Sequence, residues 1–339
     1  MDVLIPAQRD ETYEALSRRE VLQTLEPLAR DLMKNHLEKR RLWFPSDFLP
    51  ADEQMSEDEE RNLLQMRERA RGLPDSIRTA VVLNLLTEEG LPHFHRVISD
   101  HLDNSPTWRS WNYLWTAEEN RHGTVIHDYA RDARLFRMRE VEVMQYSYNE
   151  AGFTPEWEMD PYRLFAYTTL QERATQVSHR NTGRLAGEYD PTLKGILSSV
   201  AADEAKHYAF YRSVFAGVLE CDPNRALESA VSIMPSLLMP GSSMPHYREM
   251  ADVVHRSGIY TAWDYKEIVE EAIQFWAIGA LEGLKSAGRA AQEKIMGIPA
   301  RLRKVAERTE QRTRPKTFAF DFIYGRSFLM ESPARNTEY

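Results

Sequence analysis

The chain has 339 residues, of which 42% are hydrophobic and 10% aromatic, so it can bury a sizeable core. Its formal net charge of −9 argues against general nucleic-acid binding, and its single cysteine, Cys221, excludes internal disulfides and cysteine-rich metal sites. The sequence shows no secretory signal and no run of about 18 apolar residues, so we expect a cytoplasmic protein without a transmembrane helix.

The sparse glycine and the lack of alternating apolar and polar runs predict an all-α chain. We expect a single helical domain over residues 1–339, with weak order over 1–17. An N-terminal helix and loop occupy 18–50, and Pro27 bends this helix. The aromatic, proline-punctuated segment at 42–50 cannot be helical throughout, and an acidic loop then leads into another helix.

The core bundle is predicted at about residues 74–220. Its first helix begins at Pro74 and carries Glu88 on the same face as several aliphatic residues. Gly90 and Pro92 follow, and Pro92 removes a helical hydrogen bond, so we expect a local opening there. Further helices are predicted over 57–71, 106–134, 137–151, 161–186, 191–220 and 223–235.

The C-terminal helices are placed within 246–316, as one helix at 246–258 and one continuous helix at 264–296. A basic run follows within 299–316, and residues 317–339 read as an irregular aromatic tail. The basic run is either a solvated face or a docking site for an acidic partner.

The helix at 106–134 interrupts its own apolar face with Glu119 and His122, three residues apart among tryptophans. Burying a carboxylate and an imidazole is costly unless a partner such as a metal ion compensates them. The helix at 191–220 repeats this pattern with Glu204 and His207.

A lone glutamate precedes each pair at nearly the same distance: Glu88 comes before the first and Glu172 before the second. Two such halves packed antiparallel give the ligand set of ferritin-like four-helix bundles with a di-metal carboxylate centre. This oxygen-rich set suits Fe(II) or Mn(II). The alternatives are buried ion pairs without metal and, for Glu88, a solvated position beside the helix break.

Over about residues 18–245, the sequence resembles the soluble acyl-acyl-carrier-protein desaturases, the stearoyl-ACP desaturase family. The stretches that carry the resemblance are Leu42–Pro50, Leu86–Pro92, Trp115–Gly123, Gln171–Thr175, Ser178–Thr182 and Ala202–His207. Residues 51–56 and the tail after Pro315 differ from the family pattern.

The resemblance implies two iron ions. The ligands it implies are Glu88, Glu119, His122, Glu172, Glu204 and His207, with Glu119 and Glu204 bridging. It further implies that Thr175 is a candidate proton donor on the oxygen-binding side, and that Asp203 and Trp43 form a path for electrons through His122. Thr175 could instead bond only its own helix, Trp43 could be a core plug, and Asp203 a solvated acid.

The implied activity is the O₂-dependent insertion of a cis double bond into an acyl chain on acyl carrier protein. Electrons would come from ferredoxin, and the enzyme would be a homodimer. The alternatives are another di-iron oxidase or hydroxylase on the same scaffold, and an iron-binding protein without acyl turnover. Because acyl carrier proteins are acidic, the basic run is a candidate docking patch.

Overall fold

The computed structural model describes residues 16–331, except 51–55, 103–104, 154, 156–158, 238 and 240. The described chain is almost entirely helical, which confirms the predicted fold class. The expectations for 1–15, for the acidic segment at 51–55 and for 332–339 lie outside the described residues. The assignment of the whole chain to one domain stays a prediction.

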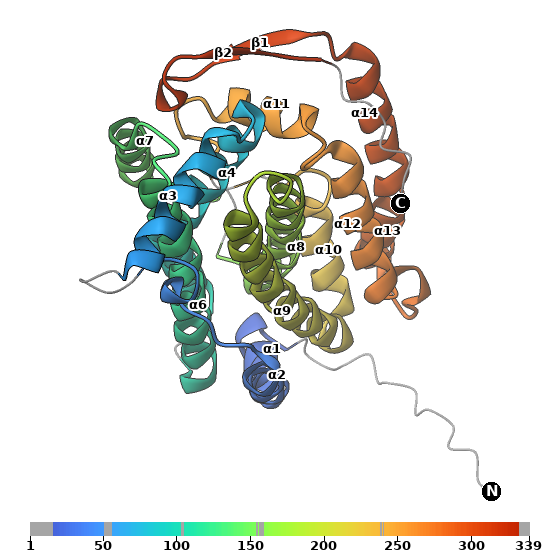
Figure 1. Cartoon of the computed structure of the whole chain (residues 1–339). Helices are drawn as coiled ribbons and strands as arrows, with labels where there is room; N and C mark the ends of the chain where they lie inside the picture. The colour runs from blue at the N-terminus through green and yellow to red at the C-terminus, as the bar shows by residue number, and fades with distance from the viewer. Residues whose placement is uncertain are drawn as a thin grey trace, which may run out of the picture.

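The elements follow one another as a series of helices that ends in a short hairpin (Figure 1). In chain order they are α1 (Arg18–Thr24), α2 (Glu26–Lys39), η1 (Pro45–Asp47), α3 (Glu57–Arg71), α4 (Asp75–Glu88), α5 (Leu91–His101), α6 (Pro106–Asp132), α7 (Met138–Ala151), α8 (Pro161–Ala186), α9 (Pro191–Cys221), α10 (Pro223–Ile233), α11 (Tyr247–Arg256), α12 (Ala262–Phe275), η2 (Ile278–Ala280), α13 (Ser286–Met296), α14 (Ile298–Arg312), β1 (Lys316–Ala319), η3 (Asp321–Ile323) and β2 (Ser327–Met330).

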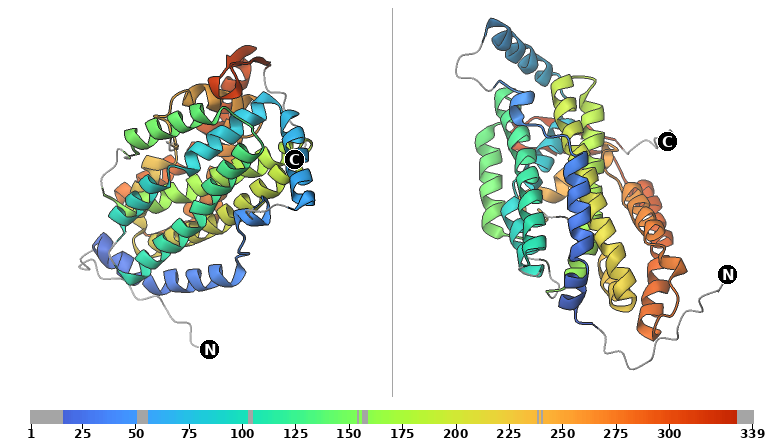
Figure 2. Two further views of the ribbon diagram at one scale, coloured as in Figure 1. Left: turned by 60° about the vertical axis from the view of Figure 1, so that its left-hand side comes forward. Right: turned by 90° about the horizontal axis from the view of Figure 1, so that it is seen from below.

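Helices α4, α6, α8 and α9 form the central bundle. Each packs against two of the others, α4 on α6 and α8, and α9 on α6 and α8, so the four close a ring. Helices α12, α13 and α14 lie on the side of α8 and α10 away from α6, as Figures 1 and 2 show. The ferritin-like core expected within 74–220 is therefore present.

Several of the long helices begin in the same way. A polar residue caps the N-terminus and a proline occupies the first helical position: Ser105 for α6, Asp160 for α8, Asp190 for α9 and Asp222 for α10. The cap side chain accepts a hydrogen bond from a first-turn N–H, and proline lacks the N–H that would otherwise stay unpaired. These local sequence features therefore mark where α6, α8 and α9 start.

Large apolar clusters lie on both sides of the bundle interior. One contains Trp108, Trp111 and Phe165, and the other contains Val81 and Leu85. In α6 the first cluster contains Trp108, Trp111 and Trp115, and the second contains Val125, Ile126 and Tyr129, so apolar side chains separate the polar segment between them from bulk water at both ends.

Two predicted breaks are confirmed. The N-terminal helix divides at Leu25, where α1 ends and α2 begins with Pro27 in its first turn. Helix α4 ends at Glu88, and Pro92 occupies the first turn of the next helix. That next helix, α5, was not predicted, because the proline was taken only as a break and not also as a start.

Two predictions for the C-terminal third are wrong. The helix expected at 264–296 is interrupted after α12, since Ala277 (φ 48°) and Gly283 (φ 69°) adopt left-handed conformations that end a helix. Part of the tail expected to be irregular forms an antiparallel hairpin in which Phe318 pairs with Phe328. Buried Phe318 and Phe320 anchor the hairpin to the core. Tertiary packing therefore stabilises strands that are too short to be recognised from the sequence pattern.

Candidate metal centre

All four bundle helices direct polar side chains into the bundle interior. The six predicted ligands are buried there: Glu88 from α4, Glu119 and His122 from α6, Glu172 from α8, and Glu204 and His207 from α9. They come from segments far apart in sequence, so only the folded bundle brings them together.

The six side chains form two groups that share two members. In each group the four ligand atoms all lie within 4.8 Å of one another. The groups are Glu88, Glu119, His122, Glu204 and Glu119, Glu172, Glu204, His207. Because Glu119 and Glu204 belong to both, they are placed to bridge two neighbouring ions.

The Nδ1 atom of each histidine faces the carboxylates. In His122 it lies 3.5 Å from an oxygen of Glu119 and 3.5 Å from one of Glu204. In His207 the distances to the same two residues are 2.8 Å and 3.8 Å. The two halves of the centre therefore have similar geometry, as the repeated sequence pattern predicts.

Burial and mutual repulsion dominate the electrostatics of the centre. Burial, with repulsion from Glu204, raises the pKa of Glu172 well above its usual range. Burial alone would lower the pKa of His122, but the carboxylates around it, Glu119 first, raise that pKa well above its usual value. Without a metal ion, the carboxylates can be neutralised by protons and by the imidazoles of His122, His207 and His179.

The donor set fits a pair of divalent cations. Within the described residues, five atoms of the cluster are buried without a hydrogen-bond partner: His122 Nδ1, His207 Nδ1, Glu119 Oε1, Glu172 Oε2 and Glu204 Oε2. Buried polar atoms are almost always satisfied, so five such atoms converging on one spot indicate ligands. Carboxylate oxygens with one imidazole per ion suit iron or manganese.

Asp203 and Trp43 lie directly outside His122, as the resemblance implied. Trp43 Nε1 donates to Asp203 Oδ2 at 2.8 Å, and His122 Nε2 lies 3.6 Å from the same oxygen. The indole stacks on the imidazole, with centroids 6.1 Å apart and planes at 6°. Arg121 donates to the carboxylate at 3.1 Å and to the Trp43 carbonyl at 2.7 Å.

Sequence reasoning missed the equivalent partner of the other histidine. Glu118 Oε2 accepts hydrogen bonds from His207 Nε2 at 3.0 Å and from His36 Nε2 at 2.8 Å. Arg40 donates to the second oxygen of Glu118 at 3.2 Å. Burial opposes ionisation, but the bonds from His207 and then His36 lower the pKa of Glu118 far below its usual range.

The signal for Glu118 was present in the sequence. An acid stands immediately before each paired ligand, Glu118 before Glu119 and Asp203 before Glu204. In the fold each acid lies beside the histidine of the other helix: Glu118 of α6 beside His207 of α9, and Asp203 of α9 beside His122 of α6. A metal-binding histidine usually bonds an outer carboxylate through its second nitrogen.

Two residues of α8 lie beside the ligands. Thr175 Oγ1 donates to the carbonyls of Glu172 at 3.0 Å and Gln171 at 3.2 Å, so in this state it bonds its own helix. His179 belongs to neither group of predicted ligands, and its Nε2 lies 2.7 Å from Glu88 Oε1. It therefore holds the carboxylate of a predicted ligand from outside the centre.

Comparisons with known proteins show the family of this chain. A family profile described as fatty acid desaturase matches residues 17–324. The chain belongs to this family. Stearoyl-[acyl-carrier-protein] 9-desaturase 1, chloroplastic, of Arabidopsis thaliana is 35% identical over 326 residues, which cover 91% of this chain and 82% of the relative. The acyl-[acyl-carrier-protein] desaturase, chloroplastic, of Cucumis sativus is also 35% identical, over 327 residues and the same shares.

The fold of the family is also found in a solved structure. DesA2 from Mycobacterium tuberculosis H37Rv, described as a putative acyl-ACP desaturase, superposes with a TM-score of 0.58 at 19% identity. The match covers 80% of this chain and 99% of that one. In the described part of this desaturase, every helix is too short or too polar to cross a membrane.

Proposed function

We propose that this desaturase introduces a cis double bond into a fatty acyl chain carried on acyl carrier protein. The observation that carries the proposal is the buried constellation of four carboxylates and two imidazoles on four helices. Family membership and the acyl-carrier desaturases among the relatives support the substrate class.

We further propose that the bound metal is a pair of iron ions. Glu88 and His122 would hold one ion and Glu172 and His207 the other, with the two shared glutamates between them. When bound, the irons would use O₂ and two electrons to remove hydrogen from adjacent methylenes, which no side-chain acid or base can deprotonate.

The chain's own residues orient the two histidines, exclude water from the centre and connect the centre with the surface. Glu118 holds the imidazole of His207 through a hydrogen bond, and the Asp203 carboxylate lies 3.6 Å from Nε2 of His122, so each Nδ1 atom points inward. Trp111 and Trp115 are buried beside the centre, and Trp115 Nε1 donates to Glu172 at 3.0 Å. Excluding water protects a strongly oxidising site from side reactions.

The route for electrons is proposed to run through Trp43 and Asp203 to His122. Trp43 bonds Asp203 and lies stacked on the imidazole, so these groups connect the surface segment at 42–50 with the centre. A ferredoxin is the proposed donor. We also propose that the enzyme is a homodimer and that it is cytoplasmic.

The mass of the product tests the proposal. The reduced, iron-loaded protein is incubated with acyl carriers of graded chain length, and the released acyl chains are analysed by mass spectrometry. We expect a loss of two hydrogen atoms. A gain of one oxygen atom would identify a hydroxylase on this scaffold, and an unchanged acyl chain with every carrier would favour an iron-binding protein.

A further inference from the structure

The basic run near the C-terminus folds around an open groove of about 680 Å³. Five cationic side chains line it: Arg256, Arg308, Arg312, Arg314 and Lys316. We call it the basic groove. None of the residues that line it is acidic. In a chain with a net charge of −9, this is a local concentration of positive charge.

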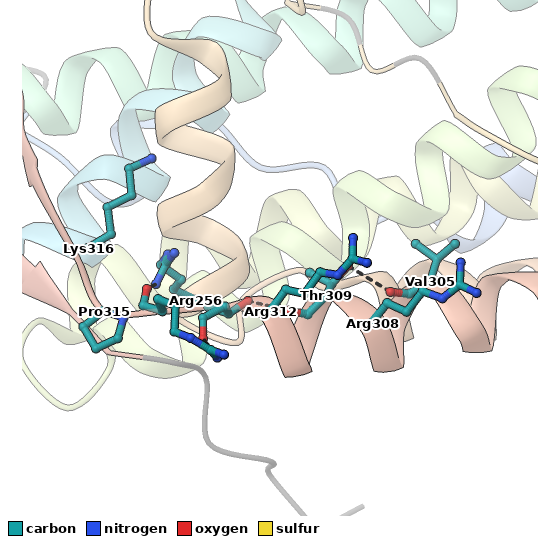
Figure 3. Close-up of a pocket in the computed structure, with 9 residues that line it drawn as sticks. Arg256, Val305, Arg308, Thr309, Arg312, Pro315 and Lys316 are labelled. Carbon is teal, nitrogen blue, oxygen red and sulfur yellow. Dashed lines mark hydrogen bonds between the residues drawn. The ribbon is translucent and has the colours of Figure 1, made fainter.

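Three elements build the basic groove, as Figure 3 shows. Arg308 and Arg312 lie one turn apart on α14, so they share one face of that helix. Arg256 is the last residue of α11, and Lys316 is the first residue of β1. Val305, half exposed, lies one turn before Thr309 on the same wall.

The cations of the groove differ in whether they form ion pairs or hydrogen bonds with other residues of the protein. Asp252 holds Arg256 at 2.7 Å and Lys316 at 3.1 Å, and Arg314 donates to the Gln311 carbonyl at 2.9 Å. Arg308 and Arg312 are exposed and form no ion pair or hydrogen bond through their side chains with any residue of the described chain. These two guanidinium groups are therefore available to an external anion.

The groove belongs to the layer that covers the ligand-bearing helices. Helix α11 packs on α4, where Val254 contacts Ala80 on the helix that ends at Glu88. Helix α14 packs on α12, which in turn packs on α8, the helix of Glu172. A partner bound in the groove would thus lie one helix layer away from the bundle that holds the metal ligands.

We propose that the basic groove docks the acyl carrier protein, with Arg308 and Arg312 binding carboxylates of its acidic surface. The inference rests on the proposed function and adds the location of the partner. Charge complementarity carries it: an acidic carrier must approach a chain that is itself acidic, and the groove offers unpaired cations around an exposed valine. Exposed, unpaired arginines suit this task because their planar guanidinium groups bind carboxylates in a bidentate manner.

The structure separates the groove from the rest of the basic run. Arg303 is exposed on α14 but lies on the opposite side of that helix from Arg308 and does not line the groove. Lys294 is exposed on α13 and does not line the groove either. These two residues provide a control with the same change in charge. The matched pair of variants is Arg308→Glu/Arg312→Glu for the groove and Lys294→Glu/Arg303→Glu for the control.

The test is the affinity of each iron-loaded variant for purified acyl carrier protein bearing a saturated chain, measured by calorimetry at low and moderate salt. We expect the groove variant to raise Kd on the order of tenfold and to flatten its salt dependence, while the control shifts Kd less than about threefold. Metal content and thermal stability confirm that both variants are folded.

Three outcomes would overturn the docking proposal: an unchanged Kd in the groove variant, equal losses in both variants, or a larger loss in the control. Binding is measured without turnover, so it is independent of the reaction. A carrier that binds the groove but is never desaturated would refute the proposed function and leave the docking surface intact. Normal desaturation, together with an unchanged Kd in the groove variant, would support the proposed function and refute the docking proposal.

Discussion

An acid from the opposite helix lies beside Nε2 of each histidine of the centre, hydrogen-bonded in the case of His207 and 3.6 Å away in the case of His122. Asp203 and Glu118 occupy equivalent positions, yet their surroundings differ: Trp43 and Arg121 accompany Asp203, while His36 and Arg40 accompany Glu118. The two ions would therefore bind in similar inner shells with different outer contacts. Only one side has an indole stacked on the ligand histidine.

The substitution Glu118→Gln tests the orienting role. The amide can still occupy the space, but it lacks the charge that holds the rings of His207 and His36. We expect metal affinity to fall about 10–100-fold, measured by titrating the metal-free protein with Fe(II). Glu89→Gln is the control, because Glu89 bonds Gln145 and belongs to neither ligand group. Equal affinities for the two variants would contradict the role.

Removing a glutamate that belongs to both ligand groups should reduce the metal content more than removing one that belongs to a single group. Glu204 belongs to both groups and Glu172 to one, so Glu204→Ala should lose one or both ions and all turnover. Glu172→Ala should retain more metal than Glu204→Ala, because the other group keeps its four members. Elemental analysis of both folded variants measures this difference. Full metal content and activity in Glu204→Ala would refute the ligand assignment.

The substitution Thr175→Ala separates a role in oxygen chemistry from one in folding. We expect normal metal content and a higher ratio of O₂ consumed to double bonds formed, because the hydroxyl is not a ligand. Thr182→Ala is the control, since Thr182 is buried on the same helix and bonds the Ser178 carbonyl at 2.7 Å in the same way. If both variants behave alike, the Thr175 hydroxyl has only a helical role.

At the scale of elements, sequence patterns predicted the long helices well. Their starts carry a polar cap followed by proline, and their apolar stripes repeat at helical spacing. The cluster of six buried side chains could be predicted for the same reason, since its members break those stripes. Glu118 escaped because a charged residue beside a ligand looks like ordinary helix surface until the neighbouring helix is placed.

The C-terminal elements were harder to predict because their signals are weak. Ala277 ends α12 in a left-handed conformation that alanine rarely adopts, so nothing in the local sequence marks the break. The hairpin strands have only four residues each, and their stability comes from aromatic contacts such as that of Phe318 with Phe320. Packing between segments that are distant in the sequence therefore determined both the end of α12 and the hairpin.

Asp252 ties the hairpin to α11. Burial would raise its pKa, but hydrogen bonds from Arg256 and Lys316 lower it below the usual value. The stabilisation is therefore complete above about pH 4 and is lost as the pH falls through the lower folded pKa. We expect Asp252→Asn to speed amide exchange of β1 and β2 at neutral pH, where the carboxylate would be charged. Exchange rates that match those of the unsubstituted chain would show that aromatic packing alone holds the hairpin.

At the scale of the whole molecule, the fold separates two electrostatic regions. Carboxylates with two imidazoles gather inside the bundle, and unpaired arginines gather in the basic groove on the outer layer. The first region costs stability unless cations occupy it, because buried like charges repel. The second suits a transient acidic partner. A desaturase acting on a carried acyl chain requires both.

The central claim is that six side chains from four helices hold two metal ions. Elemental analysis of the protein purified after growth with ample iron tests it most directly. We predict about two transition-metal ions per chain, predominantly iron. A pure, folded protein with no bound transition metal, and unable to take up Fe(II) added under anaerobic conditions, would contradict the account.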